Sequence, residues 1–437
     1  KGTNKATVTN LKGEFSFRLV KENIPETVLV FRYLGMQPKE VQVQDQSNFE
    51  VMLEQDAMSL KEVVVTSAYT GEKRREEVVG SISQLTAREL QVDRPVESFD
   101  KMLQGMVAGV QVETNTEPNK PVKINIRGQG SLTSFGGGRS TSTQPLFVVD
   151  GVPMYEQQRG DASGVFNGEN LLNPLSNINP QDIESVSVLK DASASAIYGA
   201  DAANGVIIIT TKAGAAGKTR FNLDYRTGVS SFINEFKYLS GPQYYELLRE
   251  TYINNGRPAN VAEMMAGSKT INTNWFDMLN RNASYHSANL DVSGGKDNTT
   301  YRFSSGYLNQ QASAIGNDLQ KLFFRLRLDQ NINDKLKVGV NLSPSITRQN
   351  TLNNFGNIQL PPNISPYKED GSYNNILQVP NPLAVLAQNE EYSEGVAFTG
   401  SASAKYKLTD AISFSGLLGS DYYSKKETQF KSAKNST

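Results

Sequence analysis

The sequence lacks cysteine altogether and contains a single histidine, His286, among its 437 residues. Without thiols the chain can form neither a disulfide framework nor a thiolate metal site. A lone histidine in a polar stretch has no second ligand for a metal and no partner for a proton relay. These shortages count against most enzyme classes, and we expect neither a metal nor another cofactor.

Charge of one sign is not in excess either, because 44 Lys and Arg stand against 45 Asp and Glu. This balance gives no global field that would draw in nucleic acid or another polyanion. No run of about 20 apolar residues is present, so the sequence predicts no transmembrane helix. The mean hydropathy of -0.44 is typical of a soluble protein, but the alternating strands of a membrane barrel also average to low values.

Residues 1–58 alternate short β-prone segments with turns and predict a small all-β sandwich. Each segment carries apolar or β-branched residues two apart. The segments are Lys5–Thr9, Gly13–Leu19, Thr27–Tyr33, Glu40–Val43 and Phe49–Leu53. Residues 59–78 then change character and are interpreted as a linker with one β-prone strand, Glu62–Thr66. The neighbouring sequence offers this strand no evident hairpin partner.

Residues 79–215 have the pattern of a mixed α/β domain. Helical spacing runs over Pro95–Met106, and Asn179 before Pro180 predicts a helix start, with Asn as the cap. Asp191 is a candidate cap for the small-residue segment Ala192–Tyr198. The expected strands are Gly109–Glu113, Val122–Arg127, Leu146–Val149, Glu184–Leu189 and Gly205–Thr211.

From residue 221 onward apolar and polar residues alternate in seven segments. They are Phe221–Val229, Ser287–Gly294, Tyr301–Tyr307, Phe324–Leu328, Leu336–Leu342, Phe398–Leu408 and Ile412–Tyr423. Tight polar turns join some of them, whereas the connections at about 231–284, 309–320 and 351–394 are expected to be long, an alternation typical of outer-membrane barrels. A soluble sandwich is the alternative, but its inner face would not carry charged residues on strand after strand.

The chain is expected to be incomplete at both ends. It begins with Lys1-Gly2-Thr3 and no signal peptide, which we interpret as a missing front end rather than a cytoplasmic address. Seven strands fall short of the roughly 22 strands of the largest plugged barrels. An open membrane sheet would leave unpaired backbone groups in lipid, so the sequence predicts a fragment of a longer protein.

Several segments resemble the SusC-like branch of the TonB-dependent receptors, and together they span essentially the whole chain. The most specific lie in residues 79–215. The segments are Gly13–Ser16, Val30–Gly35, Leu60–Thr66, Leu103–Val112, Ile126–Gly128, Pro145–Pro153, Ile178–Thr211, Asn274–Phe276 and Leu290–Gly295.

This resemblance implies a mainly β protein with four parts. Residues 1–58 would be a carboxypeptidase-regulatory-like β-sandwich that lacks its first strand, and residues 59–78 a linker with a TonB box. Residues 79–215 would be the α/β plug domain, and residues 216–437 about seven strands of a partial transmembrane β-barrel. The location implied is the outer membrane of a Gram-negative bacterium, with the plug and the N-terminal domain on the periplasmic side.

The resemblance also assigns candidate roles to individual residues. Glu62, Val63, Val64, Val65 and Thr66 would be the TonB box, an exposed strand to which TonB adds a strand of its own; the alternative is that they complete the sandwich sheet. Arg127, expected to be buried, would belong to an electrostatic lock between plug and barrel, or would be an ordinary bridging arginine. Asp150 and Gly151 would face the ligand, or would form only a tight turn.

The function implied is active import of a large nutrient, an oligosaccharide or a peptide, with the plug displaced by TonB. The implied partners are the TonB–ExbB–ExbD energy complex, a SusD-like surface lipoprotein as lid, and outer-membrane lipid, in a dimer of transporter–lid pairs. A structural subunit of an outer-membrane complex is the alternative. A soluble carbohydrate-active enzyme would need two carboxylates in a cleft, and the sequence offers no such pair, so we expect no enzymatic activity.

Overall fold

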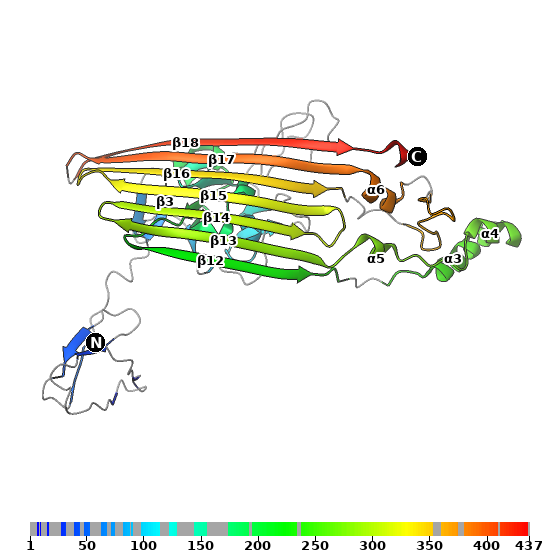
Figure 1. The fold of residues 1–437 in the computed structure, drawn as a ribbon, viewed down its shortest axis with the longest axis horizontal. Helices are drawn as coiled ribbons and strands as arrows, with labels where there is room; N and C mark the ends of the chain where they lie inside the picture. The colour runs from blue at the N-terminus through cyan, green and yellow to red at the C-terminus, as the bar shows by residue number, and fades with distance from the viewer. Residues whose placement is uncertain are drawn as a thin grey trace. The chain divides into compact units, whose positions relative to one another are not determined.

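The computed structural model divides the chain into two compact units, each described here by itself (Figure 1). One unit comprises Lys1–Val64 and Glu72–Val78, and the other comprises Val65–Gly71 and Val79–Thr437. The structure describes residues 7, 9, 15–16, 28–31, 39–43, 48–52, 63–67, 71–74, 82–87, 89–90, 98–113, 122–128, 144–154, 174–191, 195–233, 237–352, 360–374, 380–409 and 411–435.

The N-terminal unit contains an antiparallel pair, β1 (Val28–Phe31) and β2 (Lys39–Gln42). These two strands confirm the β-prone segments expected at 27–33 and 40–43. No strand forms over residues 49–52, so the strand expected at Phe49–Leu53 was wrong in its described part. The segments expected at 5–9 and 13–19 lie mostly outside the described residues.

The linker strand β3 (Val63–Ser67) pairs with β4 (Gly71–Arg74) in a two-stranded sheet. The expectation that this strand has no hairpin partner was therefore wrong. Gly, Glu, Lys and Arg have low or modest β-propensity, so β4 carries little sequence signal. The three residues between the strands are a short connection of the kind that joins hairpins.

The domain expected to be the plug, called the plug from here on, is built on a five-stranded sheet with the order β5-β10-β11-β8-β9. Apolar residues follow one another along its central strands because both faces are covered. Ile207 and Ile209 pack with the larger core cluster, whereas Val206 and Ile208 belong to a second cluster on the opposite face. The strands are β5 (Ile82–Thr86), β8 (Leu146–Val149), β9 (Val152–Met154), β10 (Ile183–Leu189) and β11 (Val206–Thr211).

Shorter elements complete the plug. They are α1 (Phe99–Met102), the hairpin of β6 (Val110–Glu113) with β7 (Lys123–Ile126), and the 3-10 helices η3 (Pro174–Asn177), η4 (Pro180–Asp182) and η5 (Ala196–Ala202). Asn179 caps η4 as expected, accepting from the Gln181 amide at 3.1 Å. Ser195 is the N-cap of η5, and residues 192–194, the start of the segment that Asp191 was expected to cap, lie outside the described residues. Of the expected plug elements, the helix is shorter than its pattern, and β5 and β9 were not anticipated.

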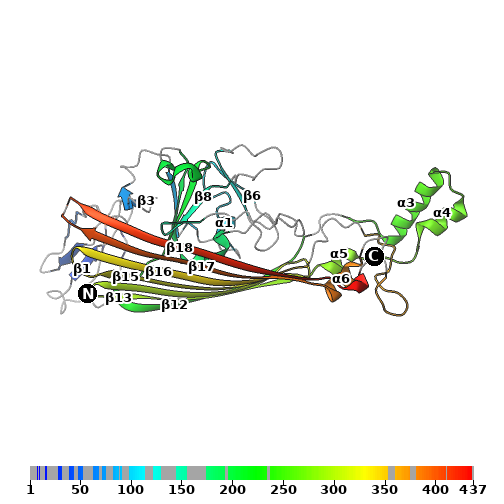
Figure 2. The same ribbon diagram turned by 90° about the horizontal axis from the view of Figure 1, so that it is seen from above.

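Seven antiparallel strands follow in consecutive order and form one open sheet, which confirms all seven alternating segments. The plug lies against one face of this sheet (Figure 2). The strands are β12 (Gly217–Ser230), β13 (Ala283–Lys296), β14 (Thr299–Gln311), β15 (Asn317–Asn331), β16 (Leu336–Thr351), β17 (Glu390–Lys407) and β18 (Ser413–Phe430).

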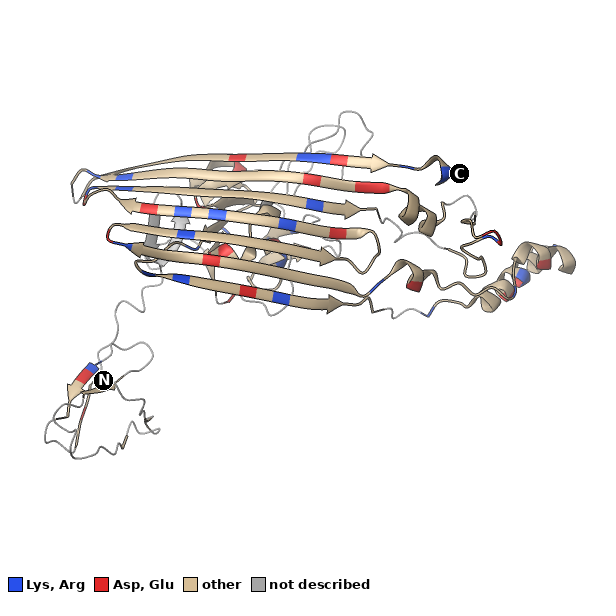
Figure 3. Ribbon diagram, viewed as in Figure 1, with Lys and Arg blue, Asp and Glu red and all other residues tan. Residues whose placement is uncertain are grey.

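The two faces of the sheet differ because successive side chains point to opposite sides. On β15 the residues Lys321, Phe323 and Arg325 are buried on the plug side, whereas Leu326 and Leu328 are exposed on the other. Charged positions recur along the strands, and β15 carries several (Figure 3). The alternation read from the sequence thus separates a charged inner face from an apolar outer face.

One expected connection was wrong. The join between β14 and β15 spans only residues 312–316, because residues 309–311 and 318–320 continue the two strands and pair with each other. These residues are mostly asparagine, glutamine and aspartate, which are common in loops, so the sequence did not indicate that the strands continue through them. The connections 231–282 and 352–389 are long, as expected. They contain α3 (Gly241–Asn254), α4 (Ala259–Ala266), α5 (Trp275–Leu279) and α6 (Pro382–Gln388).

The two long connections are tied to each other by hydrogen bonds. The Trp275 indole donates to the Pro361 carbonyl at 3.0 Å, and the Asn363 amide donates to the Ala266 carbonyl at 2.7 Å. Thr273 donates through its backbone to Pro362 at 2.7 Å. Trp275 and Asn363 are both buried, so this junction fixes the base of α3 and α4. Among the described residues, no helix is long and apolar enough to cross a membrane.

Candidate functional site

The turn between β8 and β9 places a carboxylate at the boundary of plug and sheet. Asp150 and Gly151 have φ values of 45° and 90°, and Val149 pairs with Val152 across them. Positive φ at both central residues defines a type I′ turn, for which Asp-Gly is a favoured pair. The tight turn expected here is confirmed, and it projects the Asp150 side chain out of the plug.

The Asp150 carboxylate is bound from both sides of the boundary. On the plug side it accepts from the Thr211 amide at 2.9 Å and from the Thr211 hydroxyl at 2.7 Å. On the sheet side it accepts from Asn341 of β16 at 2.7 Å and forms an ion pair with Arg325 of β15. The side chains of Asp150 and Arg325 are only 11% and 4% exposed, so each charge is matched where water is largely excluded.

Strand β15 supplies two further cations to the same boundary. The Lys321 amine donates to the Ser176 carbonyl at 3.0 Å, and the Arg327 guanidinium donates to the Thr211 carbonyl at 3.1 Å. Lys321 is fully buried, at 1% exposure. The even spacing of Lys321, Arg325 and Arg327 puts all three on one face of the strand. One strand of the sheet therefore holds the plug at three points.

A hydrogen bond between two asparagine side chains adds a contact to β13, beside a glycine of β14. The Asn179 amide donates to Asn289 of β13 at 2.8 Å. A Cβ added to Gly306, which pairs with Asn289, would lie 2.5 Å from the Asn179 nitrogen and 2.7 Å from the Asn289 oxygen. A Cβ there would push the two side-chain ends aside and break their hydrogen bond. The contact thus depends on the absence of a side chain at position 306.

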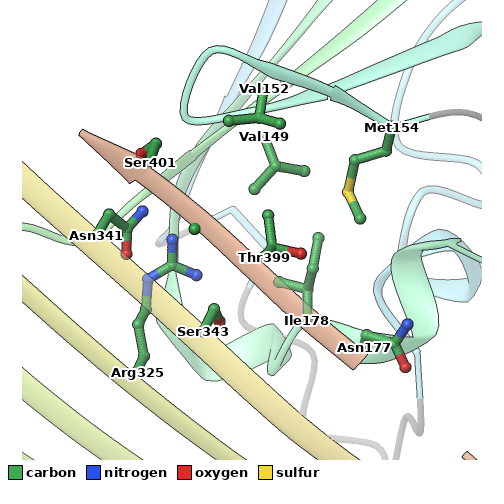
Figure 4. A pocket seen from close by; sticks show the side chains of 11 residues that line it. Val149, Val152, Met154, Asn177, Ile178, Arg325, Asn341, Ser343, Thr399 and Ser401 are labelled. Carbon is green, nitrogen blue, oxygen red and sulfur yellow. The ribbon is translucent and has the colours of Figure 1, made fainter. Parts of the chain in front are cut away.

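A small cavity of about 10 Å³ is lined in part by Arg325, the residue that pairs with Asp150 (Figure 4). Val149 and Val152 of the plug turn border it on one side, and Arg325 and Asn341 border it from the sheet. The space suffices for about one water molecule. Among the described residues, the buried Arg325 Nε and Asn341 Oδ1 atoms of this lining have no hydrogen-bond partner. A water at this position would complete their hydrogen bonding, but a nutrient does not fit.

Arg127 occupies a different place from the one expected. Its side chain is 51% exposed and forms an ion pair with Asp191, which is another residue of the plug. The expectation that Arg127 is buried was wrong, because its φ of 53° ends the extended run of β7 and turns the side chain outward. Among the described residues, the ion pair between plug and sheet is made by Asp150 instead.

A second group of charges flanks the site at the end of β11. The Lys212 amine donates to the Gln181 carbonyl at 2.8 Å. Burial lowers the pKa of Lys212 and repulsion from Arg302 lowers it further, while Asp182 and other acidic neighbours oppose the shift. On the sheet, Arg302 pairs with Asp291 at 2.6 Å. The Asp150 site thus lies within a wider boundary of paired charges.

The sequence pointed to one half of this site only. Asp150 was identified, but its partners Arg325 and Asn341 were not, although inward-facing charges on alternate positions of β15 were a usable indication. Glu62 lies outside the described residues, and Val63–Thr66 lie in β3. Across the described parts of the chain, no group of acidic or histidine side chains is placed to hold a metal.

Two family models match the chain. Residues 74–206 match the TonB-dependent Receptor Plug Domain, and residues 1–65 match the CarboxypepD_reg-like domain. The TonB-dependent receptor P26 of Formosa agariphila is 33% identical over 99% of this chain and 42% of its own length. The TonB-dependent receptor SusC of Bacteroides thetaiotaomicron is 33% identical over 78% of this chain and 32% of its own length.

Solved structures show the same fold. The RagAB peptide transporter matches with a TM-score of 0.67 and 24% identity, over 80% of this chain and 42% of that chain. The RagAB peptide importer in its open-open state matches with a TM-score of 0.68 over 84% of this chain. The chain therefore spans about two fifths of the length of the proteins that it matches most fully.

Proposed function

Since the chain belongs to the SusC-like TonB-dependent receptors, we propose that it takes part in energised import of a large nutrient across the outer membrane. Its location is the outer membrane of a Gram-negative bacterium. The proposed substrate class is an oligosaccharide or a peptide. SusC and the RagAB peptide transporter, both similar to this chain, support that class without deciding between its members.

The observation that carries the proposal is the plug held against the sheet through Asp150 and its partners on β15 and β16. Paired charges and hydrogen bonds hold this boundary, with a small cavity between them. Contacts of this kind depend on the docked geometry of the plug, so a pull that displaces the plug would break them. The proposed mechanism is that tension from TonB displaces the plug, which opens a path for the nutrient.

The proposed TonB box is Glu62, Val63, Val64, Val65 and Thr66. Strand β3 covers its last four residues and is paired with β4. A strand from TonB would therefore replace β4 or add to the edge of β3 opposite β4. Main-chain hydrogen bonds would supply most of the affinity in either case. The proposed domains keep the limits 1–58, 59–78, 79–215 and 216–437.

The proposed partners are the TonB–ExbB–ExbD complex and a SusD-like lipoprotein lid over the long connections 231–282 and 352–389, in a dimer of transporter–lid pairs. The first experiment isolates the full-length protein from its native outer membrane and identifies bound molecules by mass spectrometry. A lid lipoprotein with an oligosaccharide or a peptide would support import. A stable assembly of other barrels without lid or ligand would favour the structural-subunit alternative instead.

The second experiment tests the TonB box with the nutrient so identified. Deletion of Glu62–Thr66 is expected to abolish energised uptake and to leave nutrient binding intact. Val64→Pro should do the same, because proline lacks the amide that strand addition needs. Val64→Thr is the matched control and should preserve uptake, since threonine retains the amide and favours strands. Normal uptake by the deletion variant would contradict the assignment.

A further inference from the structure

The edge strand β5 is the first plug strand that the chain enters after the linker. In the described sheet β5 pairs with β10, from Ile82 opposite Leu189 to Thr86 opposite Ser185. Residues ahead of Ile82 lead back to β3. The premise that tension enters the plug at Ile82 rests on the proposed function. Such tension acts first on the Ile82–Leu189 pair, whichever way the plug is oriented.

The two residues after Leu189 bind a different part of the plug. The Lys190 amine donates to the Ala108 carbonyl at 2.6 Å, and Asp191 forms an ion pair with Arg127. Ala108 precedes β6 and Arg127 follows β7, and the Arg127 amide donates to the Gly109 carbonyl at 3.0 Å. The end of β10 is thus attached to the open end of the β6–β7 hairpin.

Packing at this point reinforces the attachment. A Cβ added to Gly205 would lie 2.9 Å from Ile126 and 3.0 Å from the Leu189 carbonyl. The start of β11, the end of β7 and the end of β10 therefore meet with no space between them. Burial and repulsion from Arg127 lower the pKa of Lys190, as expected for two cations held close together.

From these contacts we propose that Arg127, Lys190 and Asp191 act as a clamp that holds β10 in place while β5 separates from it. The clamp fixes the boundary between the part of the plug that yields to tension and the part that stays. Beyond β10, the sheet continues through β11 and β8 to Asp150, which Arg325 binds to the strands. The three clamp residues are positioning residues, because their part is to hold β10 to the β6–β7 hairpin through the Lys190–Ala108 and Arg127–Asp191 contacts.

The test is single-molecule pulling on the full-length receptor in a lipid bilayer, through a handle attached ahead of Val63. Release of β5 alone frees about 17 Å of chain, and release up to α1 about 60 Å, at roughly 3.4 Å per residue. If β10 follows β5, the first step frees roughly 370 Å. The unaltered receptor is expected to show a first step no longer than about 60 Å.

Asp191→Asn and Lys190→Met should lengthen the first step toward the value for loss of β10, whereas Arg127→Lys should keep it short. Glu263→Gln is the matched control, because it breaks the Arg249–Glu263 pair outside the plug. An oxidised Gln84→Cys with Ser187→Cys pair joins β5 to β10 and should remove the short step, since these residues face each other.

Two results would overturn the clamp. One is a first step of several hundred ångströms in the unaltered receptor. The other is a step that keeps its length in both Asp191→Asn and Lys190→Met. Because the handle replaces TonB, these results do not depend on whether TonB binds β3, and the uptake experiment with Val64→Pro decides that question separately.

Discussion

Replacing Asp150 by alanine tests whether the plug is held by a buried ion pair. Arg325 is 4% exposed, so the substitution leaves its guanidinium charge buried and without its counter-ion. Removing one partner of a buried ion pair typically costs about 3–5 kcal/mol. Each 1.4 kcal/mol is tenfold in the opening equilibrium, so the plug should open a hundredfold to several thousandfold more often, by order of magnitude.

The assay is amide hydrogen exchange of β8 and β11 in the full-length receptor, which reports local opening free energies. Asp150→Asn should lower the opening free energy less than Asp150→Ala does, because its amide oxygen still accepts from Thr211 and asparagine tolerates the positive φ of the turn. The matched control is Asp224→Ala on β12, whose pair with Arg226 is 33–38% exposed. Asp224→Ala should lower the opening free energy by less than about 1 kcal/mol, because its ion pair is partly exposed.

The double variant Asp150→Asn with Arg325→Met removes both charges but keeps an Asn-Gly turn and an acceptor for Thr211. Because removing a whole buried ion pair is often nearly neutral, exchange should return most of the way to the rate of the unaltered receptor. Two results would refute the account of this site. One is that Asp150→Ala lowers the opening free energy by less than about 1 kcal/mol. The other is that the double variant lowers it as much as Asp150→Ala does.

Two further predictions concern close contacts of the plug. Gly306→Ala puts a Cβ 2.5 Å from the Asn179 nitrogen and should destabilise plug docking by about 0.5–1.5 kcal/mol, the usual net worth of one hydrogen bond, measured by the same exchange assay. Gly416→Ala on β18 is its control, because nothing lies within 4 Å of the added Cβ. Arg127→Gln should raise the pKa of Lys190 toward its ordinary value, because Arg127 repels the charged amine. Acylation of Lys190 near pH 8 should then slow, as followed by peptide mass spectrometry, and unchanged acylation would contradict that cause.

The strands could be predicted because their patterns are local. The seven long strands were found from period-two alternation, and β8, β10 and β11 from short apolar runs between turns. β-propensity did not predict β4, whose mostly charged residues pair with β3 because the two strands are close in the sequence. It also did not predict the polar ends of β14 and β15. In both places the strand is formed by backbone hydrogen bonds to its neighbour, and the side chains give little indication of that pairing.

The site could be predicted only where it is local as well. Asp150 stands in an Asp-Gly turn that the sequence displays directly, but its partner Arg325 lies 175 positions later. No spacing rule connects residues so far apart, and only the docked plug brings them together. Arg127 was expected to be buried because the sequence does not display the φ of 53° that ends β7 and turns this side chain outward.

The junction between the two long connections has a practical consequence for engineering. It fixes the base of α3 and α4, while the turn between these helices, residues 255–258, is fully exposed and contains Gly256 at a φ of 79°. Exposed turns on a fixed base accept inserted sequence well. A peptide epitope inserted there would be displayed away from the plug contacts and the strand pairing. The proposed lid requires this connection to face the cell exterior, and antibody labelling of intact cells that carry the epitope would test that placement.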